Sequence, residues 1–332
     1  MRKMNLSLGK LPPELLRKYV LSMTGAKSEM VLLPPAFGVD FGVVKLSSGY
    51  LIVSSDPVTG VREQVGWYAV NVAANDVATS GNSPQFIQSI LLFPANASEK
   101  LVREVSTQVH RAASELGIAV LGGHTELTPQ LEHAIAVVTA FSIGDSFITA
   151  AQAKDGDTIM LTKAAGLEGT SILATDWRGL GLRLPASSVA RAKALGRSLS
   201  VVKEARAAFI AGGVHAMHDC TEGGVLGAVY EMASASRLGF EIYEGRIPVA
   251  TETRTICDAL EIDPLKLISS GALLLAVERG KEKKVRQALV RLGIPVSEIG
   301  RFMGRARVLI KSSGESERVR TAPTDELWRL SR

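Results

Sequence analysis

The chain has 332 residues, of which 46% are hydrophobic and 21% charged, and its formal net charge is +5. This length predicts about two domains, and the composition excludes disordered, collagen-like and coiled-coil chains. The charge is local, because residues 279–311 hold ten Lys or Arg against two Glu. Apolar residues recur there at helical spacing, which predicts a solvated helix face. Few aromatic residues accompany the charges, so we expect no nucleic-acid partner.

Neither a membrane nor an oxidising compartment is indicated. No apolar run approaches the roughly 20 residues of a membrane-spanning helix, and Lys10, Pro12 and Pro13 interrupt any apolar core that a secretory signal needs. The two cysteines, Cys220 and Cys257, cannot build a disulfide framework. We therefore expect a cytoplasmic protein without a membrane partner.

Short β-branched runs alternate with longer segments of period 3.6, which predicts an α/β (α+β) fold. In the first half, one predicted helix is Gln64–Ser80, which ends before a Gly and a Pro. The other is Ser98–Leu116, which begins at a candidate N-cap serine. The predicted strands of this half are Val43–Leu46, Leu51–Ser54, Phe86–Phe93, Ile118–Leu121 and Ala134–Ile143.

A run of small and polar residues, 150–157, predicts a boundary between two domains, residues 1–150 and 151–332. The second half mixes helices and strands in the same way as the first. Its predicted helices are Gly169–Thr175, Val201–Ala211, Gly223–Ala235 and Lys281–Leu292. Its predicted strands are Thr158–Thr162, Val214–Met217, Phe240–Tyr243, Ala272–Val277, Val296–Phe302 and Arg307–Ile310.

Common catalytic signatures are absent from the sequence, which has no G-x-x-x-x-G-K-[ST], G-x-G-x-x-G, G-x-S-x-G or H-E-x-x-H motif. These absences argue against P-loop NTPases, Rossmann dehydrogenases, α/β-hydrolases and zincins. The five histidines show no metal-ligand spacing. His215 and His218, three residues apart at a predicted strand end, would point to opposite faces.

Acidic residues instead gather at strand ends and in one apolar helix. Asp40 precedes a predicted strand, Asp56 ends one, and Asp219 follows another. Asp76, beside Asn75, lies in an apolar helix, where an unpaired carboxylate is costly. Converging carboxylates repel one another unless a cation neutralises them, and Mg²⁺ prefers oxygen ligands together with phosphate oxygens. The pattern favours a magnesium site, although Asp40 and Asp219 taken singly fit a cap or a turn better.

Two glycine-bearing turns indicate phosphate binding. Leu121–Glu126 follows a predicted strand, where bare backbone lets a ligand approach closely. Asp219–Val225 joins a strand to a helix whose free N–H groups form an anion site, with Thr221 as a candidate N-cap. Each turn alone is also compatible with an ordinary connection.

In this order the motifs resemble the PurM-like superfamily of ATP-dependent enzymes related to aminoimidazole ribonucleotide synthetase. It includes thiamine-monophosphate kinase, selenide water dikinase and the hydrogenase maturation factor HypE. The resemblance spans nearly the whole chain, and HypE looks nearest, because residues 219–224 and 260–276 are similar to its second domain. The most specific part is the Asn-Asp helix that runs into a Gly-x-x-Pro turn. The matching segments are Gly38–Gly42, Ser54–Asp56, Asn75–Asp76, Ser80–Pro84, Gly122–Glu126 and Asp219–Gly224.

The resemblance implies two mixed α/β domains of the aminoimidazole ribonucleotide synthetase type, the first of which binds ATP with Mg²⁺ and forms a β-barrel homodimer core. It also implies roles for individual residues. Asp76 and Asp219 would be catalytic, Asp76 as a base, while Asp40, Asp56 and Asp76 would bind the metal. Nucleotide contacts would come from Lys10, in a segment that folds over the phosphates, and from Asn75, Gly122, Gly123, His124, Thr125, Thr221, Gly223 and Gly224.

Three departures from the HypE pattern bear on activity. Val39 stands where relatives carry a second acid, His124 stands where they often have Asp or Glu, and no cysteine lies near the end of the sequence. The nitrile-forming reaction of HypE is therefore not expected. The leading hypothesis is an Mg²⁺-dependent, ATP-using enzyme that activates an oxygen of an unknown acceptor by phosphoryl transfer, with maturation-type proteins as candidate partners. The alternatives are a nucleotide-binding scaffold without turnover and a small-molecule kinase resembling thiamine-monophosphate kinase.

Overall fold

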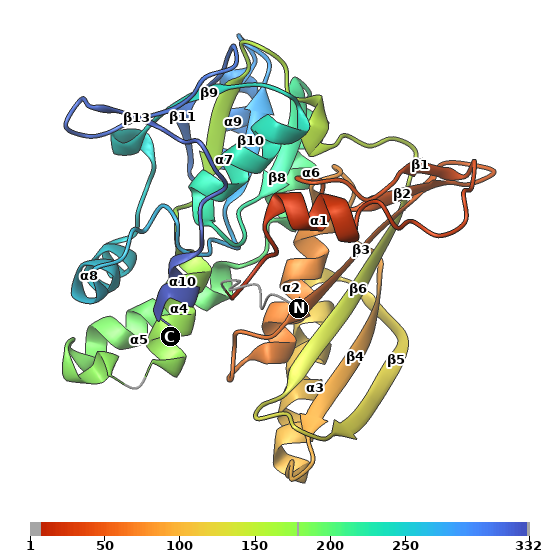
Figure 1. Ribbon diagram of the computed structural model, residues 1–332. Helices are drawn as coiled ribbons and strands as arrows, with labels where there is room; N and C mark the ends of the chain where they lie inside the picture. The colour runs from red at the N-terminus through yellow and green to blue at the C-terminus, as the bar shows by residue number, and fades with distance from the viewer. Residues whose placement is uncertain (1–7, 178, 331–332) are drawn as a thin grey trace.

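The computed structural model describes residues 8–177 and 179–330 and shows two β-sheets with helices packed on them (Figure 1). The first sheet has six strands in the order β1-β2-β3-β6-β4-β5, and only the β4–β5 pair is parallel. Its strands are β1 (Val31–Leu33), β2 (Gly42–Lys45), β3 (Tyr50–Val58), β4 (Phe86–Pro94), β5 (Ala119–Thr128) and β6 (Ile135–Gly144). The helices of this half are α1 (Pro13–Tyr19), α2 (Val65–Ala78) and α3 (Glu99–Leu116).

The two faces of the first sheet have different surroundings. One face packs against the nearly buried helix α2, with α3 beside it (Figure 1). Along β3 the buried residues Ile52, Ser54 and Val58 alternate with more exposed ones, as expected for a strand with one covered face. On the other face apolar side chains remain open to solvent, with Ile90 42% and Ile143 49% exposed. That open face is suited to contact with another protein surface.

The second sheet has seven strands in the order β13-β12-β9-β11-β7-β10-β8. Its strands are β7 (Thr158–Thr162), β8 (Val214–Asp219), β9 (Phe240–Tyr243), β10 (Leu273–Val277), β11 (Val296–Phe302), β12 (Arg307–Ile310) and β13 (Ser316–Arg318). The helices of this half are α4 (Leu167–Asp176), α5 (Ala186–Ala194), α6 (Val202–Ala211), α7 (Gly224–Ala235), α8 (Thr251–Leu260), α9 (Glu282–Val290) and α10 (Glu326–Leu330). Short 3₁₀ turns lie at Ala150–Gln152, Leu180–Leu182, Leu195–Ser198 and Glu244–Arg246.

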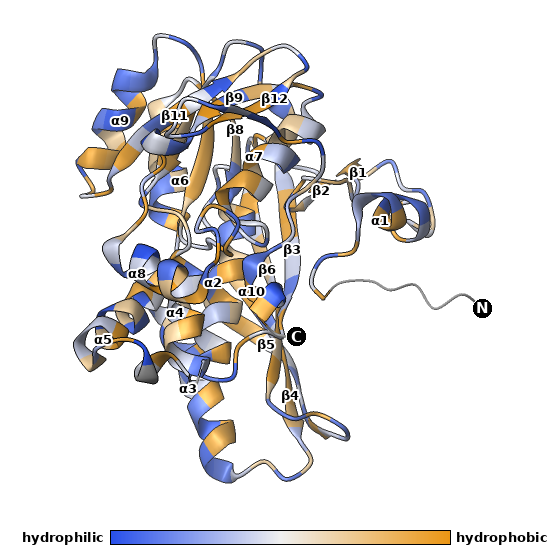
Figure 2. Cartoon of the chain, turned by 60° about the vertical axis from the view of Figure 1, so that its left-hand side comes forward, coloured by the Kyte–Doolittle hydropathy of each residue, from blue (hydrophilic) through white to orange (hydrophobic). Residues whose placement is uncertain are grey.

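Both faces of the second sheet are covered by helices. The interior strands β7 and β10 are buried along their whole length. Leu274 and Ala276 of β10 share a core with α7, whereas Leu273 and Leu275 belong to the core that includes α6 and α9. On α9, Val285 is buried while Lys283 and Lys284 are exposed, so the predicted solvated helix face is confirmed. Figure 2 shows both hydrophilic and hydrophobic residues along α9.

Helix α2 joins the two halves. The side chain of Asn75 donates from Nδ2 to the Leu199 carbonyl and accepts the Val201 N–H at Oδ1, both at 2.8 Å. Helix α2 also contacts α6 and β8, and one hydrophobic core runs through both halves. These contacts bring β8 close to α2, and Asp76 lies in the last turn of that helix.

The predicted α/β class is confirmed, and each predicted helix and strand has a counterpart. Periodicity missed the short elements α1, β1 and β13 and the helices α5, α8 and α10. The predicted division at residue 150 remains a prediction. Within residues 8–177 and 179–330, no helix combines the length and the apolar character needed to cross a membrane.

Candidate active site

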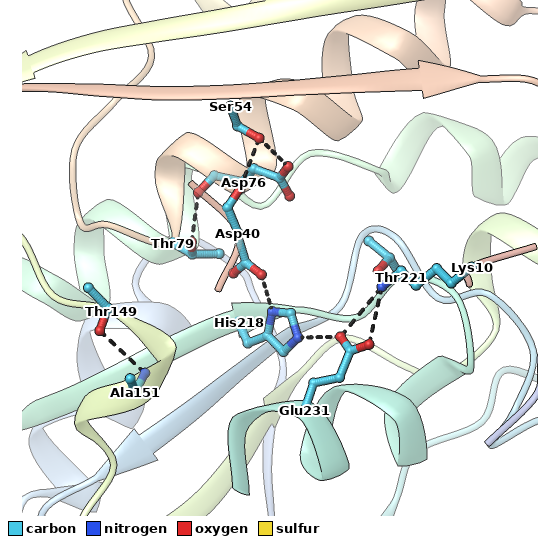
Figure 3. A network of polar contacts seen from close by, with 10 residues as sticks. All are labelled: Lys10, Asp40, Ser54, Asp76, Thr79, Thr149, Ala151, His218, Thr221 and Glu231. Carbon is cyan, nitrogen blue, oxygen red and sulfur yellow. Dashed lines mark hydrogen bonds and ion pairs between the residues drawn. The ribbon is translucent and has the colours of Figure 1, made fainter. Parts of the chain in front are cut away.

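Asp40, Ser54 and Asp76 lie close together, although they come from the loop before β2, from β3 and from α2. Asp76 lies on α2 and is 7% exposed, and its Oδ2 is 2.6 Å from Ser54 Oγ on β3. The same hydroxyl is 2.8 Å from the backbone carbonyl of Asp40. Ser54 therefore ties the loop that carries Asp40 to the helix that carries Asp76 (Figure 3).

The loop that carries Asp40 also packs directly on α7. Gly38 has a φ of +76°, and a Cβ at this position would lie 2.6 Å from the Glu231 carbonyl oxygen. Only glycine fits both this conformation and this approach. The sequence therefore requires Gly38 in order to place Asp40 between α2 and α7.

Asp40 and Asp219 present carboxylate oxygens that other side chains leave free. Ligand atoms of Asp40, His218 and Asp219 lie within 4.8 Å of one another. Among the described residues, Asp40 Oδ2 and both Asp219 oxygens are buried without a hydrogen-bond partner. Buried carboxylates without partners are costly unless a cation neutralises them. Hard oxygen donors of this kind fit Mg²⁺.

His218 has both ring nitrogens engaged by acids. Nδ1 is 2.7 Å from Asp40 Oδ1, and Nε2 is 3.0 Å from Glu231 Oε2. Burial opposes the charged imidazole, but Asp40 and Glu231 raise the pKa of His218 to about 10. Burial likewise opposes the Glu231 carboxylate, but Lys10 and His218 lower its pKa to about 2. His218 is therefore a cation that binds two acids, rather than a metal ligand.

The pKa values of Asp76 and Asp219 are raised because these acids are buried near other carboxylates. Burial first, and then the charge and hydrogen bond of Asp56, raise the pKa of Asp76 well above its usual value, and Asp219 and Asp40 add to this effect. Burial, followed by the charge of Asp40, raises the pKa of Asp219 to about 7. Asp40 and Asp56 thus both disfavour the charged forms of Asp76 and Asp219, an effect that a bound cation would offset.

The prediction that Asp56 ends a strand is wrong, because it lies inside β3, which continues to Val58. The cause is that Asp56 pairs with Val138 of β6 and the antiparallel ladder runs on for two more residues. The period of two along β3 nevertheless places Asp56 on the same face as Ser54. Asp56 therefore approaches Asp76 from within the sheet.

The prediction of a turn at Gly122 and Gly123 is also wrong. Residues Ala119–Thr128 form one continuous edge strand, β5, which pairs with β4. Gly123 pairs with Ser89, Ser89 with Val138, and Val138 with Asp56. Three strand spacings, about 14 Å, therefore separate Gly123 from Asp56. On this exposed strand His124 Nε2 is 3.0 Å from Glu126 Oε2, and the predicted nucleotide contact of residues 122–125 remains a prediction.

The second glycine-bearing turn differs from expectation in its hydrogen bonds. Gly223, not Thr221, is the N-cap of α7. The expected free N–H groups are largely taken: Asp325 Oδ2 accepts the Gly223 N–H at 2.7 Å, and the Gly224 N–H reaches the Thr221 carbonyl. The side chain of Thr221 instead accepts a hydrogen bond from Lys10 Nζ at 3.2 Å. Phosphate binding by Thr221, Gly223 and Gly224 remains a prediction.

Sequence reasoning missed Ser54, His218, Glu231 and Glu168. Burial raises the pKa of Glu168, on α4, to about 7, and this carboxyl contacts Ser270. Ser54 lies in one of the segments that match the family, whereas for the other three the signal is a single polar residue inside an apolar element. That signal is weak, because a partner far away in the chain decides whether such a residue forms a site.

Comparison with known proteins identifies the family of the chain. Residues 38–144 match the N-terminal domain, and residues 154–311 the C-terminal domain, of AIR synthase related protein. The chain belongs to the AIR synthase related family. The predicted resemblance is thereby confirmed, including two mixed α/β domains of this type.

The chain is similar to a hydrogenase expression/formation protein of Methanocaldococcus jannaschii. It is 25% identical over 227 residues, 68% of this chain and 65% of that protein. The carbamoyl dehydratase HypE of Escherichia coli is 28% identical over 264 residues, 76% of this chain and 74% of that protein. The structure of HypE in complex with ATP shares the fold, with 20% identity, a TM-score of 0.73 and coverage of 95% of this chain and 96% of that one.

Proposed function

We propose that this AIR synthase related protein is an Mg²⁺-dependent enzyme that transfers the γ-phosphoryl group of ATP to an acceptor oxygen. The observation that carries the proposal is the group of three buried carboxylate oxygens on Asp40 and Asp219 that have no hydrogen-bond partner within the described residues. Relatives support the nucleotide, because one neighbouring structure is HypE with ATP and another is a ThiL protein with AMPPCP and TMP. Both neighbours are less than 25% identical to this chain.

Asp40, Asp56, Asp76 and Asp219 would hold the cation, which supplies charge neutralisation for the triphosphate. Asp76 also acts as the base, because burial and Asp56 raise the affinity of its carboxyl for a proton. The acceptor oxygen forms a bond to the γ-phosphorus, and the bond from that phosphorus to the β,γ-bridging oxygen breaks. ADP leaves, and the proton of the acceptor passes to Asp76.

We further propose that the open face of the first sheet forms the homodimer core. Leu121 on β5 is 59% exposed, and it belongs to an edge strand whose whole length is accessible. Residues 122–125 would then lie at the dimer interface. There, residues 122–125 of one subunit would approach the nucleotide that is bound near Asp56 of the other subunit. Light scattering tests this arrangement, and a monomer would contradict it.

A maturation-type protein partner is a second expectation, since a HypE–HypF complex is among the structural neighbours.

A direct test measures ADP release from ATP and Mg²⁺ over a panel of carboxylate, amide and hydroxyl acceptors. The proposal predicts acceptor-dependent ADP formation that Asp76→Asn abolishes. Tight nucleotide binding without ADP formation on any acceptor would instead favour a scaffold. One feature supports that alternative: the N–H groups of Gly223 and Gly224, at the start of α7, are engaged by protein atoms rather than open to a phosphate.

A further inference from the structure

A row of alternating charges connects the N-terminal segment to the candidate cation site. Lys10 Nζ is 3.4 Å from both Glu231 oxygens, His218 Nε2 is 3.0 Å from Glu231 Oε2, and His218 Nδ1 is 2.7 Å from Asp40 Oδ1 (Figure 3). These four residues come from the N-terminal segment, α7, β8 and the loop before β2. The row therefore crosses between the two halves of the chain.

At the inner end of the row, His218 determines which oxygen of Asp40 is free. The imidazole binds Oδ1, and in the described part of the chain Oδ2 is buried without a hydrogen-bond partner. Ligand atoms of Asp40 and Asp219 lie within 4.8 Å of each other. His218 is 3% exposed, and because Glu231 holds its second nitrogen, the ring has a fixed orientation. The direction of Asp40 Oδ2 thus depends on Glu231 through His218.

At the outer end, the N-terminal segment is attached to the same row. Lys10 is 50% exposed at its side chain and lies outside any helix or strand. Its ammonium reaches Glu231 and Thr221, and its backbone N–H donates to Glu222 Oε2 at 2.8 Å. If Lys10 leaves, Glu231 keeps only His218 as a cationic partner among the described residues, and it competes more strongly with Asp40 for the imidazole.

We propose that His218 and Glu231 are positioning residues that couple the docking of Lys10 to divalent-cation binding at Asp40 and Asp219. This coupling rests on the proposed function, in which these aspartates hold the cation. Linkage between two sites is reciprocal. Docking of Lys10 therefore raises the affinity for the cation, and cation binding raises the equilibrium constant for Lys10 docking by the same factor.

The sign of one measurement separates this coupling from simple electrostatics. Lys10→Met removes a positive charge near the cation site, so Coulomb repulsion alone predicts tighter cation binding. Coupling predicts the opposite, weaker binding by about fivefold or more. The double variant Lys10→Met/Glu231→Gln conserves the net charge and is also expected to lose about fivefold or more. Lys27→Met, at an exposed lysine of the same N-terminal region, is the matched control.

The experiment is a Mn²⁺ titration followed by electron paramagnetic resonance, without nucleotide, for the full chain and these variants. Hydrogen exchange of residues 8–11 with and without Mn²⁺ gives a second readout: metal addition should slow exchange in the wild-type protein and in Lys27→Met, but not in the double variant. Tighter or unchanged binding by Lys10→Met would overturn the coupling alone. Absence of Mn²⁺ binding to the wild-type protein would overturn the proposed function and the coupling with it.

Discussion

Ser54 and Asp76, 22 residues apart in the sequence, share a hydrogen bond of 2.6 Å between Oγ and Oδ2 in the buried part of the site. A hydrogen bond to a charged group contributes about 1.5 to 3 kcal/mol, so Ser54→Ala should weaken Mg²⁺-nucleotide binding by about tenfold or more. Calorimetric titration measures this change. Ser55→Ala is the matched control, because Ser55 Oγ lies 2.9 Å from Thr139 Oγ1 and is exposed. Equal affinities for the two variants would contradict the role given to Ser54.

The close spacing of the aspartates predicts that removing one carboxylate stabilises the metal-free protein but weakens its binding of Mg²⁺ and nucleotide. At pH 8 without metal, Asp76→Asn removes one of four interacting acids and should raise the free energy of unfolding by about 1 kcal/mol or more. The stabilisation of the wild-type protein by Mg²⁺ and an ATP analogue should disappear in the variant. Thermal unfolding with EDTA and with Mg²⁺-nucleotide measures both effects. Exposed Asp145 offers the control Asp145→Asn, and a destabilised Asp76→Asn that still responds to ligand would refute this account.

Glu168 gives the protein a pH dependence with a definite sign. Burial raises the pKa of this carboxyl from 4.5 to about 7 in the folded protein. The unfolded chain therefore loses its proton first as pH rises, and stability present below about pH 4.5 is lost progressively up to about pH 7. Glu168→Gln remains neutral, so its free energy of unfolding relative to wild type should increase by up to about 3 kcal/mol across this window.

Chemical denaturation at pH 5 and pH 8 tests the Glu168 prediction. Glu315→Gln, at an exposed glutamate, should show no such increase. A difference between Glu168→Gln and wild type that is independent of pH would show that this carboxyl is not held protonated by its surroundings.

Gly123 and Gly122 differ in the space around them, although both have φ close to +150°. A Cβ on Gly123 would lie 1.7 Å from the Ser89 carbonyl oxygen, whereas a Cβ on Gly122 would meet nothing within 4 Å. Gly123→Ala should therefore destabilise the protein by about 1 to 3 kcal/mol more than Gly122→Ala. Urea unfolding of both variants measures the difference. Equal losses would mean that backbone strain alone, and not the contact with β4, requires the glycine.

Local patterns in the sequence predict the elements better than they predict the site. Ser98 predicts the start of α3 correctly, because its Oγ accepts the Leu101 N–H, a contact three residues away. The sequence does identify four candidate site residues, because a charged residue in or beside an apolar segment is costly unless it is paired or binds a ligand. These residues are Asp40, Asp56, Asp76 and Asp219.

Other features of the site depend on contacts that no local pattern reports. The spacing of the histidines predicts no site at His218, yet its partners Asp40 and Glu231 lie on a distant loop and a separate helix. The Gly122–Gly123 pair suggests a turn locally, but pairing with β4 extends it into a strand. Long-range pairing also gives Asn75 its role in joining the two halves.

Calorimetric titration of the full chain with a non-hydrolysable ATP analogue, with and without Mg²⁺, tests the central claim most directly. We predict binding that requires Mg²⁺ and that Asp219→Asn weakens by at least about tenfold, because this variant replaces one of the two unpartnered carboxylate oxygens of Asp219 with an amide nitrogen. Binding of equal strength in EDTA, or undiminished binding by Asp219→Asn, would contradict a shared cation and nucleotide site.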